Sequence, residues 1–575
     1  MINQWNFNSL TPEQELDQTQ MTEALGVSPI LTKLLVQRGI NTFEEAKKFF
    51  RPDLNDLHDP FLIKDMDKAV ERLNKALSKK EKILIYGDYD VDGTTAVALV
   101  YLFLSQFTNT IDFYIPDRYT EGYGISYQSI DFAKENNFSL IIALDCGIKA
   151  IDKVAYAKDA GIDFIICDHH TPDDSLPDAV AVLDSKRDDC TYPYKHLSGC
   201  GVGFKFMHAF ALNNKIDFAL LQPSLDLVAV SIACDIVPLT EENRILAYYG
   251  LKQLNESPSL GLKAIIDICR LTGKEISVSD IVFKIGPRIN ASGRMQSGHE
   301  VVELLTSHDP LFAKEKSACI NDYNDARRDV DKRTTEEAKE SLSTYQDLKN
   351  CRSIVLYNPE WSKGIVGIVA SRMCEEYYKP SIVLTKANGF ISGSARSVQG
   401  FDLYSAIDSC RDLLENFGGH MYAAGLTMKE ENLEEFRHRF EDYVTKNIQE
   451  NQLVPQIEID SELNFGDLTP KFFRILKQFS PFGPGNMKPI FCTRRVFDYE
   501  EKSRPVGKEQ EHLKLELVDS SSENVISGIA FRMSDYNEHL KALNPLDICY
   551  TLEENTFNGA TSMQLMIRDI QLSKQ

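Results

Sequence analysis

The first third of the chain alternates between two hydrophobic patterns. Short apolar runs rich in β-branched residues stand at 83–86, 111–116, 139–144 and 163–167. Between them, 93–107, 125–136 and 149–161 carry apolar residues at helical spacing. Strands that alternate with helices across short connections predict a parallel sheet with helices on both faces. Ligands of such sheets bind beyond the carboxyl ends of the strands.

The pattern changes three times further along the chain. Helices are expected to continue through 201–212 and 226–237, and the polar stretch 315–345 predicts a long exposed helix that joins two domains. A second strand–helix alternation begins at 353, followed by glycine-rich segments. After Pro455, short strands separated by turns predict an all-β barrel. We therefore divide the chain into an N-terminal helical segment, a first α/β domain, a connecting helix, a second α/β domain and a barrel, at 1–55, 56–314, 315–348, 349–450 and 455–575.

Composition narrows the class of protein. The net charge of −22 argues against a coat that binds nucleic acid without specificity. Residues 468–515 are an exception, with ten Lys or Arg against five Asp or Glu. The twelve cysteines contain no CxxC pair, which argues against a zinc ribbon and favours a reduced cytosol. Without a basic leader or a membrane-spanning apolar run, the sequence predicts a cytoplasmic protein with no membrane contact.

Acidic residues and histidines end three of the predicted strands. If the strand end at GDYDVDG stays extended, its three aspartates share one face, and Gly87 and Gly93 permit a tight turn into the next helix. One further aspartate interrupts the apolar helix that Pro238 ends. These candidate residues are Asp88, Asp90, Asp92, Asp145, Asp168, His169, His170 and Asp235.

A single aspartate at a strand end is more often a turn residue than a ligand. The set is different, because carboxylates about 4 Å apart repel by roughly 1 to 4 kcal/mol per pair. No Lys or Arg is interleaved in GDYDVDG or LDCGI to relieve this repulsion. Oxygen ligands with one or two imidazoles favour Mg²⁺ or Mn²⁺. The sequence therefore predicts a site for divalent cations.

Ten short motifs occur in an order that resembles the RecJ family within the DHH phosphoesterase superfamily. They are GDYDVDG, PDRYTEGYG, LDCGI, CDHH, ACDIVPL, GPRINASGRM, GIVGIVASR, GSARS, GGHMYAAG and PFGPGN. A DHH tripeptide alone is weak, whereas ten ordered motifs between about 80 and 500 are specific. The resemblance implies an α/β parallel-sheet DHH domain, a long connecting helix, an α/β DHHA1 domain and a C-terminal barrel of the OB type.

The resemblance also implies roles for residues. Asp145 is expected to bridge two metal ions, Mn²⁺ or Mg²⁺, with Asp88 and Asp90 on one ion and Asp92, His169 and Asp235 on the other. Asp168 and His170 are expected to orient these groups or to contact phosphate, while a capping role for Asp168 stays open. Matching motif positions imply that a terminal 5′ phosphate and the strand next to it are bound by Arg118, Arg288, Ser394, Arg396 and His420.

Two positions depart from the pattern of the superfamily. Tyr86 stands where phosphatase relatives have a metal-binding histidine, and Asp88 is expected to compensate. Ser362 stands where members of the RecJ family often have a histidine, so no role is assigned to a histidine there.

The predicted activity is metal-dependent 5′→3′ degradation of single-stranded DNA to mononucleotides in repair and recombination. Two alternatives are a phosphodiesterase acting on short oligoribonucleotides or cyclic dinucleotides, and an inactive DNA-binding scaffold. The resemblance suggests a monomer, with a single-strand-binding protein and a RecQ-type helicase as partners.

Overall fold

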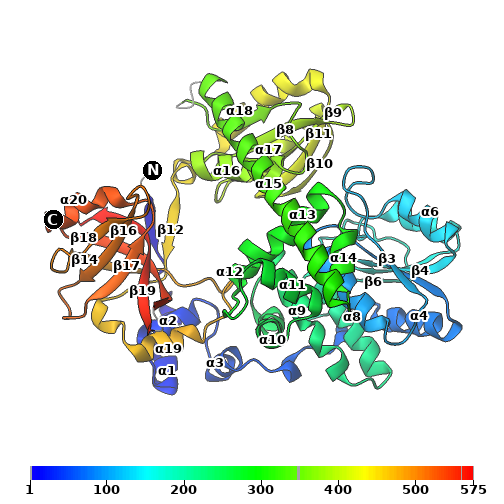
Figure 1. Ribbon diagram of the computed structural model, residues 1–575, viewed down its shortest axis with the longest axis horizontal. Coiled ribbons are helices and arrows are strands. Elements are labelled where there is room, and N and C mark those ends of the chain that lie inside the picture. The colour runs from blue at the N-terminus through cyan, green and yellow to red at the C-terminus, as the bar shows by residue number, and fades with distance from the viewer. Residues whose placement is uncertain (1–2, 346–349, 558–559, 574–575) are drawn as a thin grey trace.

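The computed structural model describes residues 3–345, 350–557 and 560–573 (Figure 1). The first α/β domain lies at the lower right of Figure 1 and the second lies above it. The β-rich C-terminal part lies at the left, with the N-terminal helices beneath it. None of the helices in the described ranges is long and apolar enough to cross a membrane.

The first domain contains the predicted parallel sheet. All its strand pairs are parallel, in the order β3-β2-β4-β5-β6. Along β2, Ile83 and Ile85 pack into one apolar core, and Leu84 and Tyr86 pack into another on the opposite face. Both faces are therefore covered, as predicted. The strands are β2 (Lys82–Gly87), β3 (Ile111–Tyr114), β4 (Phe138–Leu144), β5 (Asp163–Cys167) and β6 (Ala181–Leu183).

Helices cover this sheet and extend the domain towards the centre of the molecule. A π-helical turn, η5 (Ile281–Ile285), leads into α13. The helices are α4 (Met66–Lys79), α5 (Val91–Leu104), α6 (Tyr127–Glu135), α7 (Ile151–Asp159), α8 (Gly199–Asn213), α9 (Leu225–Cys234), α10 (Glu241–Glu256), α11 (Leu260–Ile268), α12 (Val278–Asp280), α13 (Gly286–Met295) and α14 (His299–Leu305).

A single long helix, α15 (Pro310–Tyr345), leads from the first domain to the second. It packs against α11 and α13 at one end and against α16 (Val366–Tyr377) at the other. The helix is less exposed than its composition predicts, because Ile320, Asp331 and Ala338 are buried against the two domains. Residues 346–348 of the predicted helix lie outside the described residues.

The second domain has a mixed sheet in the order β10-β11-β9-β8-β7. Only β7 and β8 pair in parallel, and the other pairs are antiparallel. The two glycine-rich segments of the sequence form strands of this sheet rather than loops. Its elements besides α16 are β7 (Ile354–Tyr357), β8 (Ser381–Ala387), β9 (Phe390–Arg396), α17 (Leu403–Asp408), β10 (Leu414–His420), β11 (Ala423–Met428) and α18 (Leu433–Asn447).

The C-terminal part closes into a five-stranded barrel. Strands pair in the order β14-β18-β19-β17-β16, and a further β14–β16 pairing completes the ring. The predicted small barrel is therefore confirmed. Its elements are β13 (Ser461–Glu462), α19 (Pro470–Lys477), β14 (Phe491–Asp498), β15 (Arg504–Val506), β16 (His512–Val518), β17 (Ile526–Ala530), α20 (Asn537–Lys541), β18 (Leu546–Phe557) and β19 (Ala560–Leu572).

The N-terminal segment packs on the barrel rather than on the sheet that follows it in sequence. The helices α1 (Pro12–Leu25), α2 (Pro29–Val36) and α3 (Phe43–Phe50) share one apolar core with α19 and the barrel. A short strand that the sequence does not predict, β1 (Gln4–Phe7), pairs in parallel with β12 (Gln456–Ile459). We call these N-terminal elements and the barrel together the barrel module.

Candidate metal centre and phosphate-binding groups

The segment that joins β2 to α5 does not stay extended. Asp88 directly follows β2, Asp90 is the N-cap of α5, and Asp92 lies in the first turn of that helix. The Asp90 carboxylate accepts a hydrogen bond from the Gly93 amide at 3.0 Å. The prediction that the three aspartates share one face of a strand is therefore wrong, because the helix begins earlier than the apolar pattern indicates.

Two glycines allow backbones to pass close to these aspartates. A Cβ atom on Gly93 would lie 2.6 Å from the Asp88 nitrogen. One on Gly199, at the start of α8, would lie 2.5 Å from the Asp145 Cβ. Real Cβ atoms do not approach so closely, so both positions need glycine for close packing. The close approach of Gly93 to the Asp88 backbone is consistent with the predicted tight turn from β2 into α5.

Asp92 is held by the amino end of α8. Its carboxylate accepts hydrogen bonds from the amides of Gly199 at 2.6 Å and Cys200 at 2.8 Å, and from the Ser231 hydroxyl at 2.6 Å. These three donors fix the position and orientation of the Asp92 carboxylate at the centre of the cluster.

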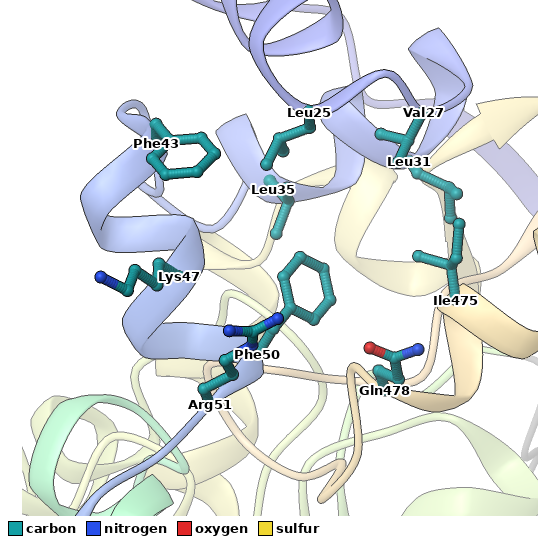
Figure 2. Close-up of a pocket in the computed structure, with 10 residues that line it drawn as sticks. All are labelled: Leu25, Val27, Leu31, Leu35, Phe43, Lys47, Phe50, Arg51, Ile475 and Gln478. Carbon is teal, nitrogen blue, oxygen red and sulfur yellow. The ribbon is translucent and has the colours of Figure 1, made fainter.

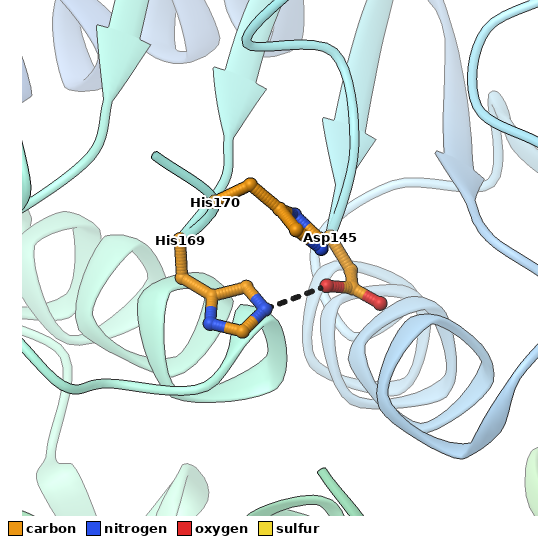
Figure 3. A group of neighbouring side chains, drawn as sticks. All are labelled: Asp145, His169 and His170. Carbon is orange, nitrogen blue, oxygen red and sulfur yellow. Dashed lines mark ion pairs between the residues drawn. The ribbon is translucent and has the colours of Figure 1, made fainter. Parts of the chain in front are cut away.

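Asp145, His169 and Asp235 converge on Asp92 from three other elements. Asp145 follows β4 and His169 follows β5, while Asp235 caps the carboxyl end of α9, which ends there rather than at Pro238. The His169 Nε2 atom lies 3.2 Å from Asp145 (Figure 3). The same atom lies 3.6 Å from Asp235 and 3.7 Å from Asp92. Asp145 has a φ of 58°, a strained value that is typical of functional sites.

Several polar atoms of this cluster are buried without a hydrogen-bond partner. They are both carboxylate oxygens of Asp88, one each of Asp145 and Asp235, and both ring nitrogens of His169. Buried polar groups are nearly always paired, so such a concentration indicates a missing ligand. Oxygen and imidazole donors together suit Mn²⁺ or Mg²⁺, so the residues present fit a divalent cation.

The carboxyl groups also carry the electrostatic signature of a cation site. Burial, followed by the charge of Asp90, raises the pKa of Asp88 well above its usual value. Burial and the charges of Asp92 and Asp90 do the same for the pKa of Asp145, and they raise the pKa of Asp235 to about 8. Without a cation, protons therefore neutralise part of the cluster at neutral pH.

Two overlapping groups of ligand atoms have the spacing that one cation needs. Asp92, His169 and Asp235 form one group and Asp145, His169 and His170 form the other, each with its atoms within 4.8 Å. The first group matches a predicted ligand set. Asp88 and Asp90 border the cluster but complete no such group within the described chain, so their ligand roles stay predictions.

Asp168 faces away from the cation position. Its carboxylate accepts hydrogen bonds from the amides of Ile148 and His169 and from His170, whose Nδ1 lies at 2.7 Å. Burial favours the neutral acid, but the His170 hydrogen bond and charge outweigh it and lower the pKa of Asp168 to about 2. Tyr123 lies 3.2 Å from the other His170 nitrogen. Asp168 is therefore placed to orient His170.

The sequence also held a signal for an acidic residue that we did not predict. Asp184 directly follows β6, at the end of the apolar run AVAVL. It is buried, with one carboxylate oxygen that lacks a partner, and its pKa is raised to about 7 by burial. The strand-end rule that found Asp145 applies equally to this position.

Arginines gather where the first domain meets the second. The Arg294 guanidinium donates to the Gly364 carbonyl at 2.7 Å, and burial followed by the charges of Arg118, Arg327 and Arg396 lowers its pKa to about 10. Clustered guanidinium groups repel one another unless an anion joins them. Their forked donors suit phosphate oxygens.

The predicted members of this arginine group lie in different places. Arg118 stacks on Tyr89, with 4.5 Å between its Cζ and the ring centroid. On β9, Arg396 donates to the Ser394 hydroxyl at 2.8 Å. Arg288 points elsewhere, because it donates to Asn321 of α15 and to the Lys284 carbonyl. Arg294, from the same motif GPRINASGRM, was missed.

His420 is the remaining predicted contact. It stands at the exposed end of β10, where its Nδ1 accepts a weak hydrogen bond of 3.4 Å from the Tyr422 amide. It pairs with Ala423 of β11 where the hairpin between the two strands turns.

The basic segment 468–515 is partly neutralised in the fold. Lys477 pairs with Glu554, Lys488 with Glu553, and Arg494 with Glu462. Phe491, an aromatic residue of the same segment, is buried in the core of the barrel. Charge counted along the sequence therefore overstates the positive surface available to a polyanion.

Comparisons with known proteins match all three domains. Family models match the DHH family N-terminal domain at 82–232, the DHHA1 domain at 350–446 and the RecJ OB domain at 459–569. The crystal structure of RecJ in complex with Mn²⁺ from Thermus thermophilus superposes with a TM-score of 0.84 at 26% identity, covering 100% of this chain and 80% of that one.

Curated relatives match along almost the whole chain. The single-stranded-DNA-specific exonuclease RecJ of Bacillus subtilis is 37% identical over 560 residues, covering 96% of this chain and 69% of the relative. The protein of the same name from Escherichia coli is 30% identical, with coverage of 97% and 98%. The chain belongs to the RecJ family.

Proposed function

We propose that this chain is a metal-dependent exonuclease that degrades single-stranded DNA from its 5′ end to mononucleotides, in DNA repair and recombination. The observation that carries this proposal is the cluster of buried carboxylate oxygens without partners at the carboxyl edge of the sheet. Arg118 stacks on Tyr89, the neighbour of Asp88, so the residue proposed to bind phosphate lies beside the acidic cluster. Relatives named as single-stranded-DNA-specific exonucleases support the substrate.

Different residues of the chain are assigned to holding the cations and to orienting the groups around them. Asp92, Asp145, His169 and Asp235 would hold Mn²⁺ or Mg²⁺, and a structure of a relative with Mg²⁺ supports that choice. When bound, such cations act as Lewis acids that stabilise the negative charge on the reacting phosphate. Other groups orient the substrate and the cluster. Asp168 fixes the ring of His170, and the α8 amides fix Asp92.

Recognition of the strand end is assigned to the arginine group. Arg118, Arg294 and Arg396 would bind a terminal 5′ phosphate, assisted by the Ser394 hydroxyl. We keep His420 as a proposed contact to the strand, because it is exposed at the end of β10. A phosphate at the arginines places the first phosphodiester near the acidic cluster, which favours release of single nucleotides.

A labelled-substrate assay tests this function. Single strands labelled at the 5′ or the 3′ end, a blunt duplex and a dinucleotide are each incubated with Mn²⁺ and with Mg²⁺. Release of a labelled mononucleotide from the 5′ end at the earliest time, with the duplex spared, is the expected result. Preferred cleavage of the dinucleotide would instead favour the short-substrate alternative, and no cleavage would favour the scaffold.

A matched pair of arginine variants tests the end-recognition site. Arg294→Ala is expected to lower kcat/KM on 5′-phosphorylated strands by roughly 10- to 100-fold, the range for a lost charge-assisted hydrogen bond. On 5′-hydroxyl strands the loss should be smaller. Arg288→Ala, which removes a guanidinium that points towards α15, should have little effect on either. Equal losses on both substrates in Arg294→Ala would contradict the assignment.

Partners and location are part of the proposal. We propose recruitment by a single-strand-binding protein and cooperation with a RecQ-type helicase, as a monomer in the cytoplasm. An acidic enzyme gains from such recruitment, because its net charge of −22 slows encounter with free DNA. Copurification with each protein, before and after nuclease digestion of DNA, is the test.

A further inference from the structure

An apolar pocket of about 450 Å³ lies in the barrel module, where α1, α2 and α3 meet α19 (Figure 2). We call it the N-terminal pocket. Leu31 and Leu35, four residues apart on one face of α2, form one wall, and Ile475 of α19 faces them. Leu25 and Val27 complete the apolar lining between α1 and α2. This volume is typical of pockets that hold a small ligand or a few side chains.

The mouth of the N-terminal pocket leaves a large aromatic side chain in solvent. Phe43, the first residue of α3, is 47% exposed, although its neighbour along the helix face, Ala46, is fully buried. Phe50, at the other end of α3, is only partly buried against the core. Exposed apolar surface that borders a pocket is a mark of an interaction site.

Positive charge without a firm partner lines the same mouth. Lys47 and Arg51 border the pocket together with the amide side chain of Gln478 (Figure 2). Lys47 lies 3.9 Å from Glu44, and both side chains are exposed, so this pair contributes little. Within the described part of the chain, no carboxylate lies within ion-pair distance of the Arg51 guanidinium.

We propose that the N-terminal pocket binds a segment of another protein in which a large apolar side chain is flanked by Asp or Glu. The apolar side chain enters between Leu31, Leu35 and Ile475, and the acidic side chains pair with Lys47 and Arg51. Charge complementarity carries this choice of partner. In a chain of net charge −22, a rim that carries Lys47 and Arg51 and no acidic lining residue among those described attracts acidic side chains that most of the surface repels.

Single-stranded nucleic acid fits the pocket less well. It needs an extended basic groove with a row of flat aromatic faces. Here five of the ten lining residues are aliphatic, and the two aromatic ones, Phe43 and Phe50, stand with Lys47 on one short helix, α3. The parallel sheet of the first domain is remote from the N-terminal pocket (Figure 1), so occupancy attaches a partner without blocking the metal centre. The proposal is therefore independent of the nuclease assignment.

Fluorescence anisotropy with peptide pools tests the proposal on the full chain. The acidic pool contains labelled, amidated pentapeptides with two Glu, one position randomised among Leu, Ile, Phe, Met and Trp, and two further Glu. The control pool has Lys in place of each Glu. The acidic pool should bind with saturation and at least tenfold more tightly than the basic pool. Equal binding of the two pools would overturn the proposal.

Point variants locate the binding. Arg51→Glu and Phe43→Ala should each weaken binding of the acidic pool by about tenfold or more, since one loses a charge-assisted contact and the other an apolar one. Lys75→Glu, an equal charge change at an exposed position of α4, should not. Unfolding temperature and nuclease activity on a naked oligonucleotide should stay at wild-type values.

Two further results would also overturn the proposal. Wild-type affinity in both Arg51→Glu and Phe43→Ala would place the peptide elsewhere on the chain. Displacement of the bound acidic pool by a single-stranded oligonucleotide, in the wild type but not in Arg51→Glu, would identify the pocket as a nucleic-acid site instead.

Discussion

Two buried groups of charged residues in the first domain differ in how their polar atoms are satisfied. Around Glu242, one carboxylate oxygen accepts from Lys205 at 2.8 Å and from the His58 amide, and the other accepts from the Tyr192 hydroxyl. At the sheet edge, Asp88, Asp145, Asp235 and His169 leave buried atoms without partners. A satisfied network stabilises the fold, whereas an unsatisfied one indicates a site that waits for a ligand.

The contrast also shows that the burial of a charged residue does not by itself indicate a functional role. Both Lys205 and Glu242 are fully buried, yet each has an ion-pair partner of opposite charge. Asp145 is equally buried, but the charges that act on it most strongly are those of other aspartates. Function is therefore indicated by like charges held together, and not by buried charge as such.

The largest expected effect follows from Asp145→Asn. This change should lower kcat by about 10³-fold or more, because loss of a ligand at the centre of the cluster forfeits several kcal/mol of cation-derived stabilisation. The metal-free variant should unfold at the same or a higher temperature than the wild type, because one of several mutually repelling carboxylates is gone. Thermal unfolding with and without Mn²⁺, together with kcat, measures both effects. A metal-free variant that is much less stable than the wild type would contradict this view of the cluster.

The second prediction is the converse change, Glu242→Gln. It should lower the free energy of unfolding by about 3–5 kcal/mol, because it leaves the buried Lys205 ammonium without its counter-ion. The rise in unfolding temperature caused by Mn²⁺, and kcat at low temperature, should remain. Chemical denaturation and single-turnover assays give the two numbers. If Glu242→Gln instead abolished the Mn²⁺ effect, the two groups of residues would not be separable.

A smaller effect is expected from Asp168→Asn. Both oxygens of Asp168 accept hydrogen bonds, so the amide places a donor against the Ile148 amide or the His170 ring. Loss of an orienting group beside a metal site lowers activity by roughly 10- to 100-fold. The number of Mn²⁺ ions bound, measured by isothermal titration calorimetry, should not change. Loss of a bound ion would make Asp168 a ligand.

The smallest effect concerns pH. Burial and the charges of Asp92 and Asp90 raise the pKa of Asp235 to about 8 in the metal-free chain, so a cation must displace its proton at lower pH. For each proton that the cation displaces, the affinity for Mn²⁺ should therefore fall about tenfold with every pH unit below about pH 8. The raised pKa also means that the metal-free chain loses stability as pH rises towards 8. Calorimetry in buffers of different ionisation enthalpy counts the protons released, and a pH-independent affinity would refute the assignment.

Much of the sheet was predictable, because its signals are local. Apolar runs such as ILIY and LIIAL can be buried only in strands covered on both faces, and their ends fix where Asp145 and His169 stand. The same rule identifies Asp184, which we overlooked. The barrel and the long helix were also evident from changes of hydrophobic period.

Other features depend on contacts between distant parts of the chain. The pairing of β1 with β12 joins residues about 450 positions apart, and no local pattern encodes it. Asp92 lies in the first turn of α5, where the amides of α8 bind its carboxylate and Gly93 and Gly199 allow the backbones to pack closely. Arg294 and Arg288 belong to one motif, and only the fold shows which of them faces Arg118.

The proposed activity depends most directly on cations at the sheet edge. Crystals soaked in Mn²⁺ and measured at the manganese absorption edge test this claim. The predicted result is anomalous density at two positions, one in contact with Asp92, His169 and Asp235 and one in contact with Asp145. In Asp145→Asn crystals, the density beside residue 145 should disappear. An absence of anomalous density among these side chains at saturating Mn²⁺ would contradict the account.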